Sequence, residues 1–256
     1  MDTGTNSATC VFGASVIGPL HLQRKLPCQD ACSYRTLSGA TLIAVADGLG
    51  SAAQSETGSK LAVAAAIQAL ETMLSTNAAI EREELVREAA RTARKALEDQ
   101  QNSRLNDLAC TLILALFETK QLTVAHVGDG AVVADFNGAL QMVSGPGDSE
   151  FTNEVIPLTS STWERELRIT SAGMAESIAV FTDGCQRAAF RKTEAGLVPF
   201  DGFFRPIFSF AREITDAAAG LDEIQELLAS NKMCHNSDDD KTLVIAVRNI
   251  SQNIHD

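Results

Sequence analysis

Short apolar runs bounded by polar turns recur along the chain, and this pattern predicts a protein built largely from β-strands. The runs are rich in Val, Ile, Leu and Thr. Turn pairs such as Ser38-Gly39 and Asn137-Gly138 separate several of them, as in antiparallel hairpins. We expect the four runs between residues 109 and 143 to form an antiparallel meander. The predicted strands cover residues 9–17, 31–36, 41–46, 109–117, 121–127, 131–135, 140–143, 177–182 and 242–247.

Two long segments have the spacing of helices instead. Residues 55–75 repeat Ala, Leu, Ile and Met at helical intervals, and Ser55 with Glu56 suits an N-terminal turn. Residues 80–105 place apolar side chains on one face and Glu and Arg elsewhere. Two consecutive helices between blocks of strands predict an α-hairpin that covers one face of a sheet. The remaining segments, residues 18–29, 145–167 and 186–236, are predicted as irregular. The last of them contains one predicted helix, at 221–229.

Composition and charge narrow the possible classes of protein. The chain has 256 residues, 45% of them hydrophobic, and contains no linker or internal repeat, so one domain is the simplest organisation. The formal net charge of −12 argues against a nucleic-acid partner and against an anionic membrane surface. No apolar run approaches the roughly 18 residues of a membrane span, and the N-terminus lacks the features of a signal peptide. We therefore expect a cytoplasmic protein.

The six cysteines are scattered along the sequence, and several lie inside apolar runs. In a chain of this length, such a distribution is typical of reduced thiols in a cytoplasmic protein. A zinc site is an alternative for Cys28, Cys32, Cys234 and His235, but their spacing is not a recognised zinc pattern. The cysteines therefore contribute little to a functional prediction.

Four apolar runs carry an aspartate at one end. Asp47 follows the run 42–46, and Asp129 and Asp183 follow two later runs, each next to glycine. The last run is preceded by three consecutive aspartates, residues 238–240. For any single copy, Asp-Gly is more often the turn of a hairpin than a site. For the set, a cluster of carboxylates at one end of the strands is favoured.

All candidate ligands in such a cluster are oxygen donors, which select Mg²⁺, Mn²⁺ or Ca²⁺ over zinc or copper. So many carboxylates remain ionised together only when cations offset their charge. Two ions roughly 3.5–4 Å apart would suit the cluster, because such a pair activates a bridging water and holds a phosphoryl oxygen. The pattern thus predicts hydrolysis of a phosphate ester without a covalent intermediate. The candidates are Asp30, Asp47, Asp129, Asp183, Asp239 or Asp240, and the carbonyl of Gly48.

The order of these motifs resembles that of the PPM-type, metal-dependent protein phosphatases, the protein phosphatase type 2C family. The matching blocks are Gln29-Asp30-Ala31 and residues 45–50, 127–130, 181–184 and 239–242. The resemblance extends from about residue 10 to residue 248, so it implies a single phosphatase-like domain over residues 1–256. It also implies the family fold: an α+β protein, an α-β-β-α sandwich of two antiparallel sheets flanked by helix pairs.

The resemblance implies a role for each aspartate. We prefer Asp240 over Asp239 as a ligand because it directly precedes the Lys-Thr-apolar strand. The cofactors implied are two Mg²⁺ or Mn²⁺ ions, with a third, looser ion in bacterial relatives. In this resemblance Asp47 would bridge the first two ions, the carbonyl of Gly48 would bind the first ion, and Asp183 and Asp240 would bind the second ion. Asp129 would bind the third ion, and Asp30 would orient a metal-bound water.

The chain departs from the family pattern at two positions. Many relatives have glutamate where this chain has Gln29, and some eukaryotic members have a histidine, the proposed general acid, where it has Leu49. His21 and His126 are the available substitutes. Because His126 lies inside an apolar strand, a packed core residue is the better interpretation for it, whereas a catalytic role for His21 stays open.

The family's phosphate-binding arginine lies shortly before the first aspartate. Strict spacing places it at Lys25, and Arg24 is its neighbour. We favour Arg24 because a guanidinium binds phosphate with two parallel hydrogen bonds. The alternative is that both residues are solvated loop charges.

The sequence therefore predicts a cytoplasmic, Mg²⁺- or Mn²⁺-dependent phosphatase of phosphoserine or phosphothreonine in proteins. Its expected partners are a phosphorylated protein substrate and a cognate kinase, and a monomer is the default state. One alternative is a catalytically weak, phosphatase-like regulatory domain that binds metal or a phosphoprotein. Another is a metal-dependent hydrolase of small phosphate esters.

Overall fold

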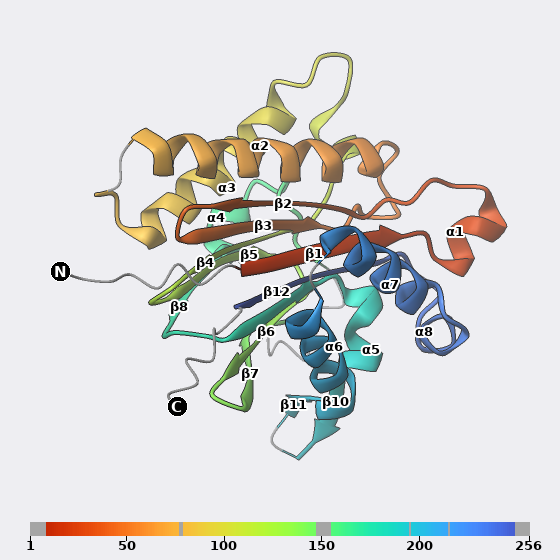
Figure 1. Cartoon of the computed structure of the whole chain (residues 1–256). Helices are drawn as coiled ribbons and strands as arrows, with labels where there is room; N and C mark the ends of the chain where they lie inside the picture. Colours follow the sequence, from red (N-terminus) through yellow and green to blue (C-terminus); the bar gives the residue numbers. More distant parts are fainter. Residues whose placement is uncertain (1–8, 77–78, 147–154, 195, 215, 249–256) are drawn as a thin grey trace, which may run out of the picture.

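The computed structural model of the chain describes residues 9–76, 79–146, 155–194, 196–214 and 216–248. In these residues two antiparallel sheets pack face to face, and helices cover the two outer faces (Figure 1). The predicted α+β class and α-β-β-α sandwich are thus confirmed. Within the ranges described, the helices are too short or too polar to cross a membrane.

Each main sheet has five strands in the described part of the chain. The first sheet, in the order β2-β3-β4-β5-β8, contains β2 (Ala31–Leu37), β3 (Ala40–Ala46), β4 (Leu112–Glu118), β5 (Leu122–Val127) and β8 (Arg168–Ala172). The second, in the order β1-β12-β9-β6-β7, contains β1 (Thr9–Val16), β12 (Lys241–Arg248), β9 (Ser177–Phe181), β6 (Ala131–Phe136) and β7 (Ala139–Ser144). A separate hairpin pairs β10 (Phe190–Thr193) with β11 (Gly196–Pro199).

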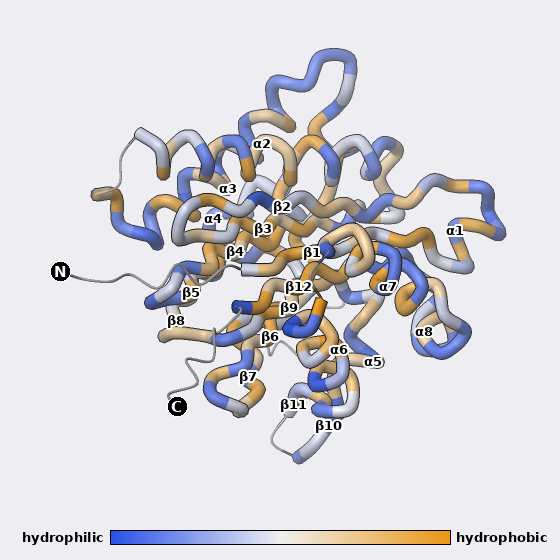
Figure 2. The backbone as a smooth tube through the Cα atoms, in the orientation of Figure 1, coloured by the Kyte–Doolittle hydropathy of each residue, from blue (hydrophilic) through white to orange (hydrophobic). Residues whose placement is uncertain are grey.

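The central strands are buried on both faces. Ile43 of β3 packs with Val180 of β9 in the apolar layer between the sheets. Its neighbour Leu42 points the opposite way, into the layer under α2 (Ser55–Thr76) and α3 (Arg82–Glu98). Because successive side chains of a strand alternate between its faces, a strand covered on both sides reads as a continuous apolar run. Figure 2 shows this hydrophobic interior between the more polar helices.

Four helices cover the outer face of the second sheet in the described part of the chain, and one of the two longer ones, α6 (Asp201–Glu213), is not predicted from the sequence. Pro206 lies inside that helix, and proline in a helix interior usually ends a helix. Phe204 and Phe208 from it are fully buried in the core under the second sheet. The four helices are α5 (Gln186–Ala189), α6, α7 (Ala217–Ala229) and α8 (Asn231–Asn236).

The predicted meander between residues 109 and 143 is wrong in one respect. β4 and β5 belong to the first sheet, whereas β6 and β7 belong to the second. The chain changes sheet at Gly128, which has a φ of 116°. A Cβ at this position would lie 2.5 Å from the side chain of Thr111, so glycine permits both the backbone angle and the close approach.

The segments with weak periodicity differ most from the prediction. The helix expected over residues 80–105 ends at Glu98, and Asn102 has a left-handed φ of 68° in the turn that follows. β8 was not predicted because it is an edge strand with no fully buried residue. Other short elements of the described residues also lie outside the predicted ones. They are α5, α8, β10 and β11, together with α1 (Pro19–Arg24), η1 (Leu105–Leu108), α4 (Trp163–Glu166) and η2 (Asp183–Cys185).

Asp135 on β6 ties α6 to the second sheet. Its side chain is 3% exposed, and its Oδ2 accepts hydrogen bonds from Arg205 and Arg212 of α6, both at 3.2 Å. Its Oδ1 accepts a third hydrogen bond, at 2.8 Å, from the amide of Gly138. One buried carboxylate thus binds two arginines of α6 and the turn between β6 and β7.

We expect Asp135→Ala to lower the free energy of unfolding by about 2 kcal/mol, because it leaves two arginines without their shared partner. The cost stays below that of a fully buried pair, since the arginines are 39% and 37% exposed and water compensates part of it. Urea denaturation measures the change. The matched control is Asp201→Ala, which removes an exposed partner of Arg205 and should cost less than about 1 kcal/mol. Equal losses in the two variants would contradict this account.

Candidate active site

The candidate carboxylates come from strand ends at one edge of the sandwich. Asp47 follows β3 of the first sheet, and Asp183 follows β9 of the second. Asp30 precedes β2, Asp129 lies between β5 and β6, and Asp239 lies two residues before β12. In Figure 1 these strand ends lie on the side of the molecule that carries α1, α5 and α8. The fold therefore gathers residues that are far apart in the sequence.

These carboxylates raise one another's pKa values. Burial, followed by the charges of Asp30, Asp183, Asp239 and Asp129, holds the pKa of Asp47 well above its ordinary range. Burial, followed by Asp129 and Asp239, raises the pKa of Asp183 to about 6. Because the charge of one aspartate shifts the pKa of another, these side chains lie near one another, and a positive charge among them would be stabilised.

Asp30 is 3% exposed and held by two hydroxyl groups from the second sheet. Thr182 and Thr242 each donate a hydrogen bond of 2.8 Å to its Oδ2. Burial raises the pKa of Asp30 to about 7; the two hydroxyls oppose this shift, and the charges of Asp240 and Asp183 add to it. These contacts fix Oδ2 and leave Oδ1 to face other groups.

Gly48 lies in a narrow space between two backbone segments. A Cβ at this position would lie 2.7 Å from the carbonyl oxygen of Gln29 and 2.8 Å from that of Ser55. The amide of Asp47 donates to the hydroxyl of Thr111 at 2.9 Å, which fixes the turn at the end of β3. Glycine is therefore required for the chain to pass here, next to the acidic cluster.

Asp240 and Asp239 have different surroundings. The buried carboxylate of Asp240 accepts hydrogen bonds from the amides of Gly18 at 2.7 Å and Gln29 at 2.6 Å, and it contacts His21 Nδ1 at 2.8 Å. Asp239 is exposed, and its charge acts on Asp47, Asp129 and Asp183. The charge of Asp239 thus acts on three carboxylates of the cluster, which supports the alternative ligand that the sequence left open beside Asp240. Asp240 instead closes the 18–29 segment.

The three basic residues expected near the site occupy two kinds of position. His21 is 6% exposed and paired with Asp240. Arg24 and Lys25 are exposed at the end of α1, and neither appears among the charges that shift the carboxylate pKa values. Lys25 has a left-handed φ of 56° and caps the helix. The structure therefore does not bring Arg24 and Lys25 against the carboxylates.

His126 is a core residue, as predicted. It is fully buried on β5, and its Nδ1 lies 2.8 Å from the hydroxyl of Ser144. Burial, followed by the charge of Arg168, holds the pKa of His126 well below its ordinary value. A neutral, enclosed imidazole of this kind is suited to packing rather than to proton transfer with a substrate.

Several residues that support the site have no signal in the sequence. The buried Lys241 donates to the carbonyl of Asp239 at 2.7 Å, and Arg168 donates to the carbonyl of Gly128 at 2.7 Å. Gln186 donates to the carbonyl of Asp129. A Lys-Thr pair before an apolar strand is visible in the sequence, but the contact between Lys241 and the preceding loop depends on the folded backbone.

The donor set fits hard divalent cations. All five side chains are carboxylates, and Asp129 Oδ1 is buried without a hydrogen-bond partner, which leaves it available to a cation. Among the described residues, no three His, Cys, Asp or Glu side chains converge as closely as metal ligands do. This holds for the aspartates as well as for the cysteines and His235 of the zinc alternative.

Comparisons with known proteins agree with this architecture. The sequence model of the family described as Protein phosphatase 2C matches residues 17–228. The chain is 29% identical to Serine/threonine-protein phosphatase 3 of Escherichia coli (strain K12), over 91% of this chain and 96% of that protein. Among solved structures, the catalytic domain of the serine threonine protein phosphatase PstP in complex with 2 manganese ions is similar, with a TM-score of 0.63 and 20% identity over 94% of this chain and 98% of that one. A bacterial serine phosphatase has a TM-score of 0.64 with 13% identity over the same shares of the two chains.

Proposed function

Because the chain belongs to the protein phosphatase 2C family, we propose that it hydrolyses phosphoserine and phosphothreonine in proteins with the help of divalent metal ions. The observation that carries this proposal is the cluster of aspartates where the strand ends of both sheets meet, in which burial and neighbouring carboxylates raise the pKa values of Asp30, Asp47 and Asp183. The E. coli relative, named as a serine/threonine-protein phosphatase, supports the substrate class. The PstP complex with two manganese ions supports the cofactor.

In this proposal five residues hold Mg²⁺ or Mn²⁺. Asp129, whose Oδ1 has no protein partner, serves a third and looser ion. When bound, the ions would offset the charge of the carboxylates, acidify a water molecule and hold a phosphoryl oxygen. The proposed ligands are Asp47, the carbonyl of Gly48, Asp129, Asp183 and Asp239.

The protein's own groups orient the reactants. Thr182 and Thr242 fix Oδ2 of Asp30, so that Oδ1 is free to accept a proton from the attacking water. Asp240, through the Gly18 and Gln29 amides, holds the segment that carries Arg24. We propose Arg24, ahead of its neighbour Lys25, as the group that binds phosphate oxygens, since a guanidinium donates two parallel hydrogen bonds.

We also propose a cytoplasmic location and a cognate kinase that supplies the phosphoprotein. The six cysteines, all free, are consistent with a reducing compartment. A monomer is sufficient for the proposed chemistry, because one chain contributes every carboxylate of the cluster.

Phosphate release from three substrates tests the proposed substrate class. We expect a phosphothreonine peptide to be hydrolysed with a higher kcat/KM than a sugar phosphate, with p-nitrophenyl phosphate as a generic reference. A preference for the sugar phosphate would favour a hydrolase of small esters. Binding of the phosphopeptide without release of phosphate from any substrate would favour the regulatory, phosphatase-like domain.

The roles of the two neighbouring aspartates are separable. Asp239→Asn removes a carboxylate that faces the cluster, so we expect the Mn²⁺ concentration for half-maximal activity to rise at least about tenfold. Asp240→Asn puts an amide group where two backbone amides and His21 need an acceptor, so we expect it to lower the free energy of unfolding by about 1–3 kcal/mol. Mn²⁺ titration of activity and urea denaturation, measured on both variants, give the two quantities. An altered Mn²⁺ requirement in Asp240→Asn alone, with normal stability, would restore the sequence-based assignment.

A further inference from the structure

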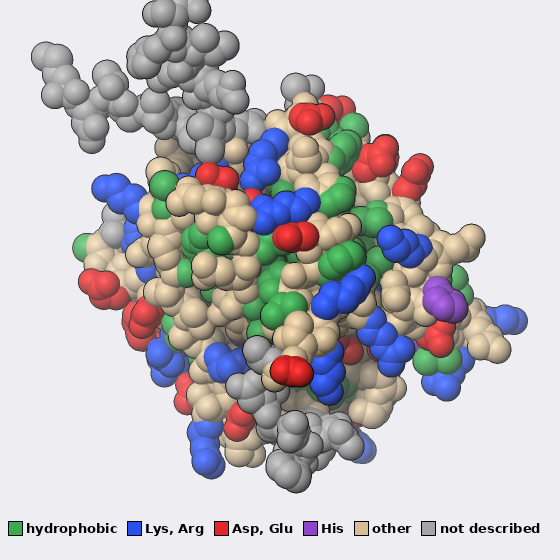
Figure 3. Space-filling model, turned by 90° about the horizontal axis from the view of Figure 1, so that it is seen from below, with side chains coloured by type: hydrophobic (Ala, Val, Ile, Leu, Met, Phe, Trp, Pro, Cys, Tyr) green, Lys and Arg blue, Asp and Glu red, His purple; other side chains and the backbone are tan. Residues whose placement is uncertain are grey.

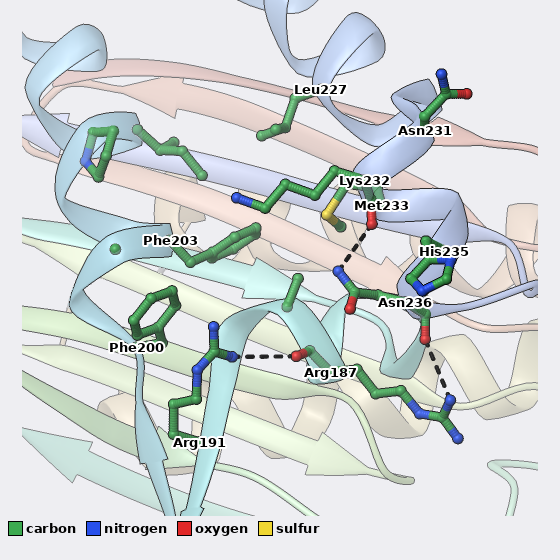
Figure 4. Close-up of a pocket in the computed structure, with 14 residues that line it drawn as sticks. Arg187, Arg191, Phe200, Phe203, Leu227, Asn231, Lys232, Met233, His235 and Asn236 are labelled. Carbon is green, nitrogen blue, oxygen red and sulfur yellow. Dashed lines mark hydrogen bonds between the residues drawn. The ribbon is translucent and has the colours of Figure 1, made fainter.

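A cavity of about 580 Å³ lies beside the candidate active site, on the outer face of the second sheet. Residues of α5, α6, α7, α8 and β10 line it (Figure 4). α5 begins directly after η2, which contains Asp183, and α8 ends three residues before Asp239. Two stretches of chain therefore contribute residues both to the cavity and to the acidic cluster.

The floor of the cavity is apolar. Phe203 and Ile207 of α6 and Met233 of α8 line it with less than a tenth of each residue exposed. In Figure 4, Phe203 and Leu227 point into the space between the helices. The cavity is large enough to hold a large apolar side chain, and its apolar floor favours such a group.

The rim of the cavity is cationic. Arg187, Arg191 and Lys232 line it together with His235, and none of the lining residues is acidic. The chain as a whole carries 33 acidic and 21 basic residues, so a basic rim of this size is unlike the average surface. Figure 3 shows several Lys and Arg side chains next to apolar surface on the face seen from below. Charge complementarity therefore points to an acidic occupant.

Two of these cations are positioned to bind an anion. The guanidinium of Arg191 lies over the ring of Phe200, 3.6 Å from its centroid, and its Nη1 donates to the carbonyl of Phe190 at 2.9 Å. The hydrogen bonds of this guanidinium, to the carbonyls of Arg187 and Phe190, use Nη1, so Nη2 and Nε have no hydrogen-bond partner among the described residues. Lys232 Nζ likewise has no ion pair or hydrogen bond within the described part of the chain, and Figure 4 shows this side chain extending across the cavity.

We propose that this cavity docks an acidic segment of the phosphoprotein substrate. A large apolar side chain of that segment enters between α6 and α8, and neighbouring carboxylates contact Arg187, Arg191 and Lys232. The identity of the occupant rests on the proposed function, whereas the affinity for an acidic, apolar peptide does not. A basic docking surface beside the site attracts acidic sequence to a protein whose net charge is otherwise −12.

Direct binding tests the cavity without reference to catalysis. The probe is a fluorescein-labelled, unphosphorylated peptide in which Glu alternates with Phe and Leu, and the readout is fluorescence anisotropy. We expect Lys232→Glu and Arg187→Glu each to weaken its binding about three- to tenfold, and added salt to weaken its binding to the wild type. Lys192→Glu makes the same charge change at the residue that follows Arg191 on β10 and does not line the cavity. It should leave the affinity within about twofold of the wild-type value. No binding to the wild type, or equal losses in Lys232→Glu and Lys192→Glu, would overturn the proposal.

Catalysis then tests whether the occupant is part of a substrate. Two phosphothreonine peptides are compared, one short and one joined to the acidic, apolar segment through Gly-Ser spacers of roughly 4 to 12 residues. We expect the wild type to have a higher kcat/KM for the longer peptide than for the short one at one spacer length. In Lys232→Glu the ratio of these two kcat/KM values should be near one, whereas in Lys192→Glu it should stay as in the wild type. Peptide binding with no such ratio at any spacer length would overturn the assignment to substrate. Absence of p-nitrophenyl phosphate hydrolysis in the wild type would instead refute the proposed function and leave the binding result intact.

Discussion

Asp47→Asn is expected to reduce metal-dependent phosphate release at least about a thousandfold, equivalent to about 4 kcal/mol of activation free energy. Asp47 lies at the centre of the cluster, since four other aspartates act on its pKa. An amide at this position keeps the size of the side chain and removes the charge that attracts divalent ions. The proposed catalysis depends on that charge, and the remaining carboxylates do not replace it.

The same substitution is expected to stabilise the metal-free protein. Burial and the surrounding carboxylates raise the pKa of Asp47, so its ionised form is unfavourable in the fold when no cation is present. A neutral amide removes this repulsion, and the thermal midpoint in the presence of a chelator should rise by a few degrees. Activity and stability therefore change in opposite directions.

Phosphate-release kinetics and thermal unfolding, each with and without chelator, measure the two effects of Asp47→Asn. The matched control is Asp99→Asn, which removes an exposed carboxylate paired with Lys95 and should change neither quantity. Loss of activity together with a lower thermal midpoint would indicate that the variant misfolds. Retained activity would remove Asp47 from the proposed metal site.

The second large effect is expected in the pH dependence of stability. The pKa of Asp30 is raised to about 7 and that of Asp183 to about 6, in both cases mainly by burial, whereas aspartate in an unfolded chain has a pKa of about 3.9. Between these values the folded state binds more protons than the unfolded state. The free energy of unfolding of the metal-free protein therefore falls as pH rises from about 4 to about 7, and this contribution is constant at higher pH.

Divalent ions are expected to cancel most of this loss, because they bind the ionised cluster of the folded state. In a chelator we expect the thermal midpoint to fall by roughly 10 °C between pH 5 and pH 8, corresponding to about 2–4 kcal/mol. Mg²⁺ should then raise the midpoint much more at pH 8 than at pH 5. Thermal unfolding at both pH values measures this, with NaCl of equal ionic strength as the control for charge screening. A Mg²⁺ effect that is equal at both pH values, or reproduced by NaCl, would contradict a carboxylate metal site.

The sequence predicts the sandwich because buried strands and long helices have strong periodic patterns. β3 and β9 appear as continuous apolar runs, and α2 as a long helix, since each buries most of one or both faces. The edge strand β8 and the helix α6 lack such a signal. β8 buries little, and α6 contains a proline within an amphipathic pattern of Phe residues.

The site is predictable to the level of its motifs and not to the level of contacts. The Asp-Gly turns after apolar runs mark the strand ends that the fold brings together at one edge. The sequence does not show which of two adjacent aspartates faces the cluster, because a shift of one residue leaves the local pattern almost unchanged. Three buried contacts of Asp240, to Gly18, Gln29 and His21, distinguish the two residues only in the folded chain, because they join segments more than 200 positions apart.

The central claim is that the aspartate cluster binds divalent ions and supports hydrolysis of phosphorylated serine and threonine. Phosphate release from a phosphothreonine peptide by chelator-treated wild-type protein, before and after addition of Mn²⁺ or Mg²⁺, tests it most directly. The account predicts no release before the addition and turnover afterwards, with a dependence on metal concentration that saturates. Turnover in the chelator, or no turnover with either ion, would contradict it.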